Sequence, residues 1–511
     1  MPELTQQGLE HWVAEVLNRW PAVGLAVGVV SRGSPPLIHI HGVANIPDRT
    51  PVTEGTVFRI GSITKTFTAV AIMQLWEQGL VDLDRPANDY LRAYELVPLK
   101  STWRPATVRH LLTHTAGVPE WVRPTQMVRS RWFGETFPLE ERLPTLGEFY
   151  RGRLRLDAEP GTVWAYTDHG IATVGQIIED ITGVPLHRYL AEHVFAPLNM
   201  TDSDLLRAER LQGRLATGYT LTHSGPKALT DRNGLTAAAG AIYSTPRDMA
   251  RYVAALVGGG NSEHGTILKP ETFAAMFAPH YQPDPRIPGM GLAFWRGELG
   301  GHAVVEHQGV VPGFNSQIYL APEDGIGVMA FTNGSRNAGT WLVGEMRDLL
   351  GDLIDAGEDS IRTDIPQRPD VWADLCGWYR PRAQRTDMMA RLITGAGVQV
   401  SVRRGRLVLR ALAPMPPLYH GLTLHPADPD DPDAFQVDLA RYGLGTGRIV
   451  FSRDRSAHVT GVHFDGLLLS ADKKADSASQ GLRVAAAVGT TTAATTAGTV
   501  RHPGRTHPRQ R

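Results

Sequence analysis

The sequence has very little cysteine, with one residue, Cys376, in a chain of 511. A single cysteine excludes a disulfide within the chain and any zinc site built from several cysteines. A lone cysteine more often packs as a small apolar residue than acts as a nucleophile, and we expect this of Cys376. Other side chains are therefore expected to carry the chemistry.

The chain also lacks an uninterrupted apolar run of about 18 residues, so we expect no membrane-spanning helix and no membrane partner. The first residues, MPELTQQGLEHWVAEV, lack the basic start and continuous apolar stretch of a secretory signal. We expect a cytoplasmic protein on this basis.

An excess of charge of either sign is missing as well. Lys and Arg number 51, Asp and Glu number 52, and the formal net charge is −1. Nucleic-acid binding usually needs a marked excess of positive charge, so we expect a small molecule or a peptide as the partner. The composition makes no prediction of the oligomeric state.

Histidine pairs occur at His39 with His41 and at His110 with His114. Neither pair is accompanied by a His-Glu-x-x-His pattern or by a cluster of carboxylates. We expect structural roles for these histidines, and neither a metal nor an organic cofactor.

Hydrophobic periodicity predicts two domains. The first, residues 1–354, is expected to hold a helix at 8–19, a hairpin, a buried helix at 62–79 and antiparallel strands between 303 and 334. Further helices are expected at 168–183, 186–194, 245–257 and 337–355. Residues 118–150 are irregular, and they could form a mobile wall near a pocket or pack under a long loop.

Residues 355–370 are polar and contain two prolines, which predicts a linker. Residues 371–475 alternate between short apolar-polar segments and turns, which is typical of a small β barrel or sandwich. Residues 476–511 are small and polar and end in a basic run, so we expect a disordered tail.

Ser-x-x-Lys occurs three times, at Ser62 to Lys65, Ser224 to Lys227 and Ser470 to Lys473. Only the first opens a long apolar helix, in FRIGSITKTFTAV, where the i, i+3 spacing places the hydroxyl beside the ammonium group. A helix N-terminus in a dry environment favours an alkoxide and lowers a lysine pKa. This arrangement is typical of an activated serine.

Two later segments can complete such a site. PGTVWAYTDHG contains Tyr166 and Asp168, and no other tyrosine is followed two places later by Asn or Asp. EHQGVVPGF contains His307, Gln308 and Gly309 on an expected strand, where the glycine would let a substrate approach the backbone.

These motifs, in this order and with VRHLLTHTAGVP and GLTAAAGAIYSTPRDMARY, resemble the serine hydrolases related to class C β-lactamases, D-Ala-D-Ala peptidases and family VIII esterases. The resemblance covers residues 10–350. It implies an α/β (α+β) fold, in which an antiparallel sheet is flanked by helices and carries a helical subdomain. Residues 371–475 resemble the lipocalin-like β domain of some members, through LCGWYRP and the strand alternation.

The resemblance implies a role for each motif residue. Ser62 would be the acyl-enzyme nucleophile, Lys65 its activating partner, and Tyr166 the general base that returns the proton to the leaving group. The backbone N–H groups of Ser62 and Val310 would form the oxyanion hole. Substrate-binding positions would be Asp168, His307, Gln308, Gly309 and Val310.

Two positions depart from the family pattern. Asp168 stands where Asn is usual, and its charge should keep Lys65 protonated, so that the lysine cation depresses the pKa of Tyr166. His307 stands where β-lactamases have Lys, and a histidine is largely neutral at pH 7, so the pocket loses a fixed positive charge.

We therefore expect a metal-independent serine hydrolase that acts through an acyl-enzyme on a small ester or amide, most like a carboxylesterase. One alternative is a D-amino-acid peptidase or amidase, or a weak β-lactamase. Another is a non-catalytic binding or scaffold protein that keeps the fold, with Asp168 as the sign of lost activity.

Overall fold

The computed structural model describes residues 4–122, 135–357, 360–384, 386–411, 413, 419–440, 445–466 and 468–475. The tail predicted to be disordered, residues 476–511, lies outside these ranges. So does the stretch 123–134 of the predicted wall.

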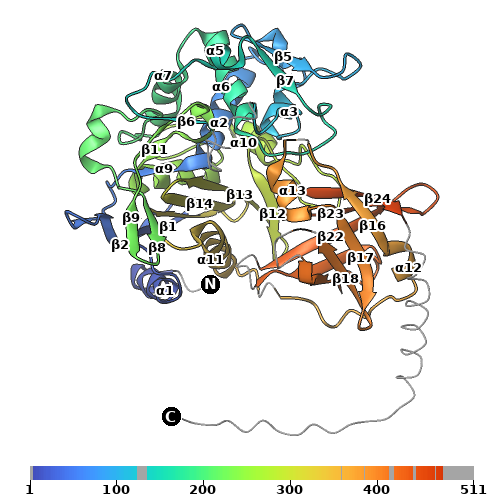
Figure 1. Cartoon of the computed structure of the whole chain (residues 1–511). Coiled ribbons are helices and arrows are strands. Elements are labelled where there is room, and N and C mark those ends of the chain that lie inside the picture. The colour runs from blue at the N-terminus through green and yellow to red at the C-terminus, as the bar shows by residue number, and fades with distance from the viewer. Residues whose placement is uncertain are drawn as a thin grey trace, which may run out of the picture.

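A seven-stranded antiparallel sheet is the central layer of the first part of the chain (Figure 1). Its strand order is β12-β13-β14-β15-β1-β2-β3, so the first hairpin of the chain pairs with strands from residues 295–332. The strands are β1 (Gly24–Ser31), β2 (Leu37–Asn45), β3 (Thr50–Pro51), β12 (Trp295–Leu299), β13 (His302–Val311), β14 (Phe314–Ala321) and β15 (Ile326–Thr332).

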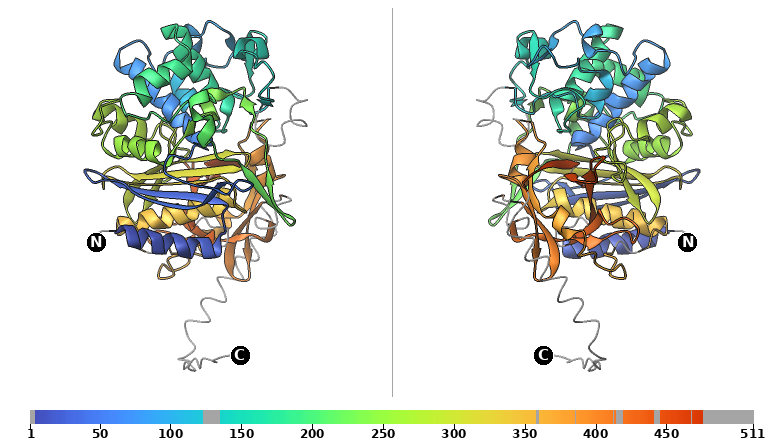
Figure 2. Two further views of the ribbon diagram at one scale, coloured as in Figure 1. Left: turned by 90° about the vertical axis from the view of Figure 1, so that its left-hand side faces the viewer. Right: turned by 90° about the vertical axis from the view of Figure 1, so that its right-hand side faces the viewer.

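Side chains alternate between the two faces of this sheet and supply two cores. On β1, Leu25, Val27 and Val29 pack with α1 (Gln6–Arg19) and α11 (Ala338–Leu353). Ala26 and Val30 belong to the larger core on the opposite face. Figure 2 shows α1 and α11 as one layer and the helical subdomain as the other.

The helical subdomain surrounds α2 (Thr64–Glu77), whose residues from Thr64 to Leu75 are all buried. A helix that is apolar all round is expected to be enclosed by others. Gly79, with φ +73°, follows the C-cap residue Gln78, and a glycine in this conformation commonly ends a helix. The other helices here are α3 (Val108–Leu112), α5 (Leu146–Tyr150), α6 (Asp168–Thr182), α7 (Leu186–Leu190), α8 (Ala237–Gly240), α9 (Pro246–Val257) and α10 (Pro270–Phe277).

Short strands and single turns connect these helices. The strands are β4 (Phe58–Arg59), β5 (Glu95–Pro98), β6 (Thr136–Phe137), β7 (Arg153–Leu156), β8 (Tyr219–Thr222), β9 (Gly225–Ala228), β10 (Asn233–Gly234) and β11 (Tyr243–Ser244). The turns are η1 (Gly61–Ile63), η2 (Ala87–Asp89), η3 (Ala191–Phe195) and η4 (Glu209–Arg214). The Ser224 to Lys227 motif therefore lies in the β8–β9 hairpin and not on a helix.

The C-terminal part is a nine-stranded antiparallel sheet in the order β19-β18-β17-β16-β24-β23-β22-β21-β20. Strand β19 lies against β21, so the sheet is nearly closed like a barrel. Its interior is filled by residues such as Trp372, Tyr379, Phe435 and Phe451. The strands are β16 (Gly377–Pro381), β17 (Val398–Arg403), β18 (Arg406–Ala411), β19 (Leu422–Thr423), β20 (His425–Pro426), β21 (Ala434–Asp438), β22 (Thr446–Arg453), β23 (Val459–Phe464) and β24 (Leu469–Ala475).

Strands β16 and β24 pair at the middle of this sheet. Ser470 and Lys473 lie in β24, where residues three apart point to opposite faces. Two short helices, α12 (Trp372–Leu375) and α13 (Met388–Thr394), complete this part. Cys376 is buried, and burial raises the pKa of its thiol to about 11, so it packs as an apolar residue.

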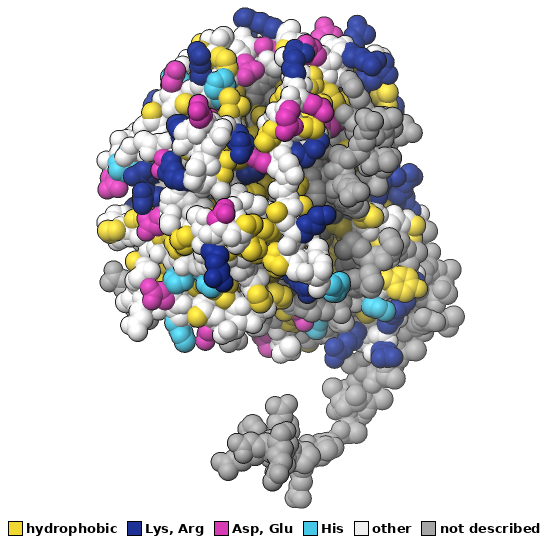
Figure 3. Space-filling model, turned by 60° about the vertical axis from the view of Figure 1, so that its left-hand side comes forward, with side chains coloured by type: hydrophobic (Ala, Val, Ile, Leu, Met, Phe, Trp, Pro, Cys, Tyr) yellow, Lys and Arg dark blue, Asp and Glu magenta, His cyan; other side chains and the backbone are white. Residues whose placement is uncertain are grey.

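Lys and Arg side chains are interspersed with Asp and Glu on the face shown in Figure 3. Within the described ranges, no helix combines the length and the apolar character that a membrane crossing needs.

Candidate active site

Ser62 lies in the single turn η1, directly before α2. Gly61 has φ +52°, and a Cβ there would lie 2.7 Å from the backbone nitrogen of Val310. At Gly309, a Cβ would lie 2.0 Å from the carbonyl oxygen of Ile60. Two glycines therefore let the turn that carries Ser62 press against strand β13.

Hydrogen bonds hold this turn from both sides. Ser316 Oγ on β14 donates to the carbonyl of Ile60 at 2.8 Å. The Ile60 N–H donates to the carbonyl of Ile242 at 3.1 Å, and the Ile242 N–H donates to Thr64 Oγ1 at 3.1 Å. The serine thus sits on a backbone fixed by the sheet and by the segment after α8.

Lys65 is one turn further along α2, and its side chain is fully buried. Its Nζ donates to Ser62 Oγ at 2.8 Å and to the carbonyl of Ala239, in α8, at 2.8 Å. The same atom lies 2.7 Å from Asp168 Oδ1. These three polar partners of the ammonium group are oxygen atoms.

Burial alone would lower the pKa of Lys65, but its value is raised because Asp168 and Tyr166 outweigh that effect. Asp168 is the first residue of α6, where the helix dipole also favours a carboxylate. Lys65 is therefore a cation at neutral pH, as expected from the Asp at position 168.

Tyr166 lies over this pair, with Lys65 Nζ 4.8 Å from the centroid of its ring. Burial raises the pKa of Tyr166 above its ordinary value of 10, while the Lys65 cation and hydrogen bonds to Lys65 and Ser62 lower it in part. The Lys65 cation thus acts on this pKa in the expected direction, but desolvation of the phenolate outweighs it and the pKa is raised.

His307 is buried on β13, and its Nδ1 contacts the carbonyl of Gln308 at 2.7 Å. Burial and the Lys65 cation lower the pKa of His307 to about 3, so the ring is neutral at pH 7. The neighbouring Gln308 side chain points to the other face of the sheet and donates to the carbonyl of Gly339 on α11. The fold therefore directs the Gln308 side chain away from Ser62.

Val310 is the last proposed site residue on β13. It is 39% exposed, and its backbone nitrogen faces the turn that carries Ser62. The fold therefore brings Ser62, Lys65, Tyr166, Asp168 and His307 together with the backbone of Gly309 and Val310.

His114, for which the sequence predicted only a structural role, packs against the Tyr166 ring. Its ring centroid is 4.5 Å from that of Tyr166, and its Nδ1 accepts from the Thr167 N–H at 3.3 Å. Burial and the Lys65 cation lower the pKa of His114 well below 6.5, so it is neutral. The tyrosine thus rests on an uncharged ring.

Trp164 is a neighbour that the sequence reading missed, although it stands two positions before Tyr166. Its ring lies 6.5 Å from the Tyr166 ring and 4.9 Å from that of Trp295. Among the residues that the structure describes, no three His, Cys, Asp or Glu side chains are grouped so as to hold a metal.

A family model described as Beta-lactamase matches residues 9–352. A β-lactamase of Yersinia enterocolitica is 24% identical over 354 residues, which cover 64% of this chain and 86% of that protein. The solved octameric penicillin-binding protein homologue of Pyrococcus abyssi has a TM-score of 0.57 at 22% identity, over 91% of this chain and 99% of that one.

The structure of a D-amino acid amidase from Ochrobactrum anthropi SV3, complexed with L-phenylalanine amide, is also similar. Its TM-score is 0.51 at 26% identity, over 64% of this chain and 90% of that chain. The Pyrococcus match extends into the C-terminal sheet, whereas the amidase match covers a share of the chain close to that of the family model.

Proposed function

The chain belongs to the β-lactamase family of serine hydrolases, and on that premise we propose that it hydrolyses a small, uncharged ester or amide through an acyl-enzyme on Ser62. The observation that carries this proposal is the position of Lys65 Nζ, 2.8 Å from Ser62 Oγ and 2.7 Å from Asp168 Oδ1. A serine hydroxyl held by a buried cation is in the setting that an activated nucleophile needs.

In acylation, Ser62 Oγ attacks the carbonyl carbon of the substrate and its proton passes to the phenolate form of Tyr166. Lys65 is already protonated, so it cannot accept that proton and instead stabilises the oxygen that loses it. The N–H groups of Ser62 and Val310 are the proposed donors to the developing oxyanion. Gly61 and Gly309 support this assignment because they bring the two backbone segments together.

Tyr166 then gives the proton to the leaving alcohol or amine, and the acyl group stays on Ser62. A water molecule attacks the acyl carbon in the second half-reaction, with Tyr166 again taking the proton. The Ser62 oxygen leaves with a proton and the acid product is released. No step needs a metal or an organic cofactor.

The electrostatics favour a substrate without a carboxylate near the reacting bond. His307 is neutral, and the charge of Lys65 is matched by that of Asp168. An anionic group would therefore find no uncompensated cation among these residues, which favours carboxylesterase-like activity. We also propose that this activity belongs to residues 1–354, because α11 ends at Leu353 and the first C-terminal helix starts at Trp372.

The amidase from Ochrobactrum, at 26% identity, favours a second candidate, an amidase or peptidase acting on D-amino-acid compounds. A side activity on β-lactams remains part of this candidate. The Asp168 carboxylate accepts but does not donate hydrogen bonds, and so it offers no donor to a substrate acyl amide carbonyl.

A substrate panel separates these candidates. We expect p-nitrophenyl butyrate to be hydrolysed faster than D-phenylalanine p-nitroanilide and nitrocefin, and Ser62→Ala to lose the activity. Ser224→Ala is the matched control, since Ser224 belongs to the same short motif on an exposed hairpin. A faster anilide reaction would favour the amidase, and no turnover of any substrate would favour a non-catalytic protein.

A further inference from the structure

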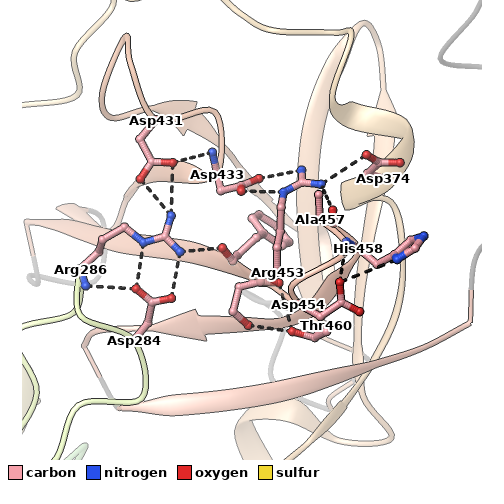
Figure 4. A network of polar contacts seen from close by, with 12 residues as sticks. Asp284, Arg286, Asp374, Asp431, Asp433, Arg453, Asp454, Ala457, His458 and Thr460 are labelled. Carbon is pink, nitrogen blue, oxygen red and sulfur yellow. Dashed lines mark hydrogen bonds and ion pairs between the residues drawn. The ribbon is translucent and has the colours of Figure 1, made fainter.

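The loop from Asp284 to Met290 joins the hydrolase part to the C-terminal sheet through Arg286 (Figure 4). The Arg286 guanidinium donates to both oxygens of Asp284 at 2.8 Å and to Asp431 Oδ2 at 2.9 Å. It also donates to the carbonyl of Phe451, on β22, at 2.7 Å. One arginine thus has carboxylates of both parts as partners.

A second arginine in the same view, Arg453, provides a comparison. It pairs with Asp433 at 2.7 and 2.9 Å and with Asp374 at 3.3 Å, both within the C-terminal part. The two arginines have similar chemistry, but only Arg286 crosses from one part to the other.

Apolar contacts continue from Arg286 toward the active site. Ile287 and Met290 pack with three residues of the C-terminal sheet, Ala434, Val450 and Leu468. The Trp164 indole N–H donates to Met290 Sδ at 3.3 Å, and the rings of Trp164 and Trp295 lie 4.9 Å apart in the same cluster. Because the indole donor of Trp164 is occupied, its ring offers mainly apolar surface.

The segment that leads to Tyr166 is held by the C-terminal part at a second point. Thr386, which follows β16, donates to Asp157 Oδ2 through its hydroxyl at 2.9 Å and its N–H at 3.2 Å. Asp157 stands at the start of the segment, and Trp164 stands near its end. The C-terminal sheet therefore contacts the segment through Thr386 and through the Arg286 loop.

We propose that Trp164 and Trp295 form an aromatic shelf for a flat apolar group of the substrate, and that the C-terminal sheet holds this shelf beside Tyr166 through Arg286. Both tryptophans are only partly buried, and Trp164 borders the Tyr166 ring. Stacking on such rings selects planar apolar groups. This inference rests on the proposed function, and it makes Arg286 a positioning residue rather than a catalytic one.

The shelf predicts a preference for esters with an aromatic acyl group. This preference can be measured with two esters that share the p-nitrophenol leaving group. The test compares p-nitrophenyl phenylacetate with p-nitrophenyl acetate by the ratio of their kcat/KM values. We expect the full-length protein to prefer the phenylacetyl ester. Trp164→Leu and Arg286→Met should each lower that ratio by roughly tenfold, the scale of a lost apolar pocket contact.

Asp431→Asn replaces one carboxylate oxygen beside Arg286 with an amide nitrogen and removes the negative charge. It is a milder variant if Arg286→Met does not fold. Arg286→Lys should recover part of the ratio, because it keeps the charge but loses the two-pronged geometry. Arg453→Met is the control, since it removes two ion pairs that are both confined to the C-terminal part. It should lower the thermal midpoint and leave the ratio unchanged.

A protein with no preference for the phenylacetyl ester would overturn the shelf. Equal losses on both esters in Arg286→Met and Asp431→Asn, with the ratio preserved, would show a purely structural role and overturn the positioning part. Failure of the proposed function is seen separately, as the absence of ester turnover together with the absence of a fluorophosphonate adduct on Ser62.

Discussion

Lys65 and Asp168 form an ion pair 2.7 Å long, in which the lysine side chain is completely buried and the aspartate is 37% exposed. Lys65 lies at the start of α2, just after the proposed nucleophile Ser62. Asp168 is the first residue of α6, two positions after the proposed base Tyr166. The main consequence of the pair is electrostatic, because the carboxylate raises the pKa of Lys65 in a place where burial alone would lower it. A charged Lys65 leaves Tyr166 as the proton acceptor for Ser62.

Activity should rise with pH in the alkaline range. Tyr166 accepts a proton only as a phenolate, and burial raises its pKa above 10, so the active fraction grows as the pH approaches that pKa. Asp168→Asn removes a negative charge that raises the pKa of both Tyr166 and Lys65, and the rising limb of kcat/KM should move to lower pH. The control Asp324→Asn, at an exposed turn, should leave the limb in place. An unchanged profile in Asp168→Asn would contradict this account.

Loss of the lysine should be severe. Lys65→Met removes the hydrogen bond to Ser62 and leaves the Asp168 carboxylate without its cation. We expect kcat to fall by about 10² to 10⁴, the range for loss of a group that assists proton transfer. Steady-state kinetics on an ester would measure this effect. Lys227→Met, in the exposed Ser-x-x-Lys hairpin, should keep full activity, and equal effects of the two variants would count against a role for Lys65.

Gly309 should not tolerate a methyl group. The added Cβ would lie 2.0 Å from the Ile60 carbonyl and 2.3 Å from Ser316 Oγ, so β13 and the Ser62 turn would have to separate. Gly309→Ala is expected to lower both the thermal midpoint and the rate of Ser62 acylation. Gly213→Ala is a suitable control because its Cβ would meet nothing within 4 Å. Normal acylation in Gly309→Ala would argue against the close approach of the two segments.

Glu306 should make stability depend on pH. Burial raises its pKa from 4.5 to about 7, and its Oε2 accepts a hydrogen bond from the Gln317 amide at 2.6 Å. A carboxyl group with a raised folded-state pKa contributes stability below its unfolded pKa, and this contribution is lost as the pH rises from 4.5 to 7. The loss amounts to about 3 kcal/mol at most. Thermal midpoints measured from pH 4.5 to 8 should fall across this window, and Glu306→Gln should flatten the fall. If the thermal midpoint of Glu306→Gln falls equally over this pH range, groups other than Glu306 cause the fall.

The first part of the fold could be predicted well from its sequence. The apolar stretch after Ser62 is so long and so evenly hydrophobic that only an enclosed helix suits it, and α2 is buried from Thr64 to Leu75. Thr107 caps α3 and forms a capping box with His110, a feature set by residues three apart in the sequence. Such features depend on residues close together in the sequence, so the local sequence pattern is enough to predict them.

Features that depend on distant residues were harder to predict. Strand β24 carries two adjacent lysines and an aspartate, so its pattern lacks the expected alternation, and pairing with β16 and β23 decides its state. The direction of the Tyr166 pKa required knowing how deeply the ring is buried. The link from Arg286 to the C-terminal sheet had no local signal, because Asp431 lies 145 residues away.

The most direct measurement of the central claim is the mass of peptides after incubation with a fluorophosphonate and, separately, with a slowly hydrolysed ester. The account predicts a single adduct on the peptide that contains Ser62, lost in Ser62→Ala and formed more slowly in Tyr166→Phe and Lys65→Met. It also predicts an unchanged adduct in Ser224→Ala. An adduct that persists in Ser62→Ala, or turnover of the ester without any adduct on Ser62, would contradict the account.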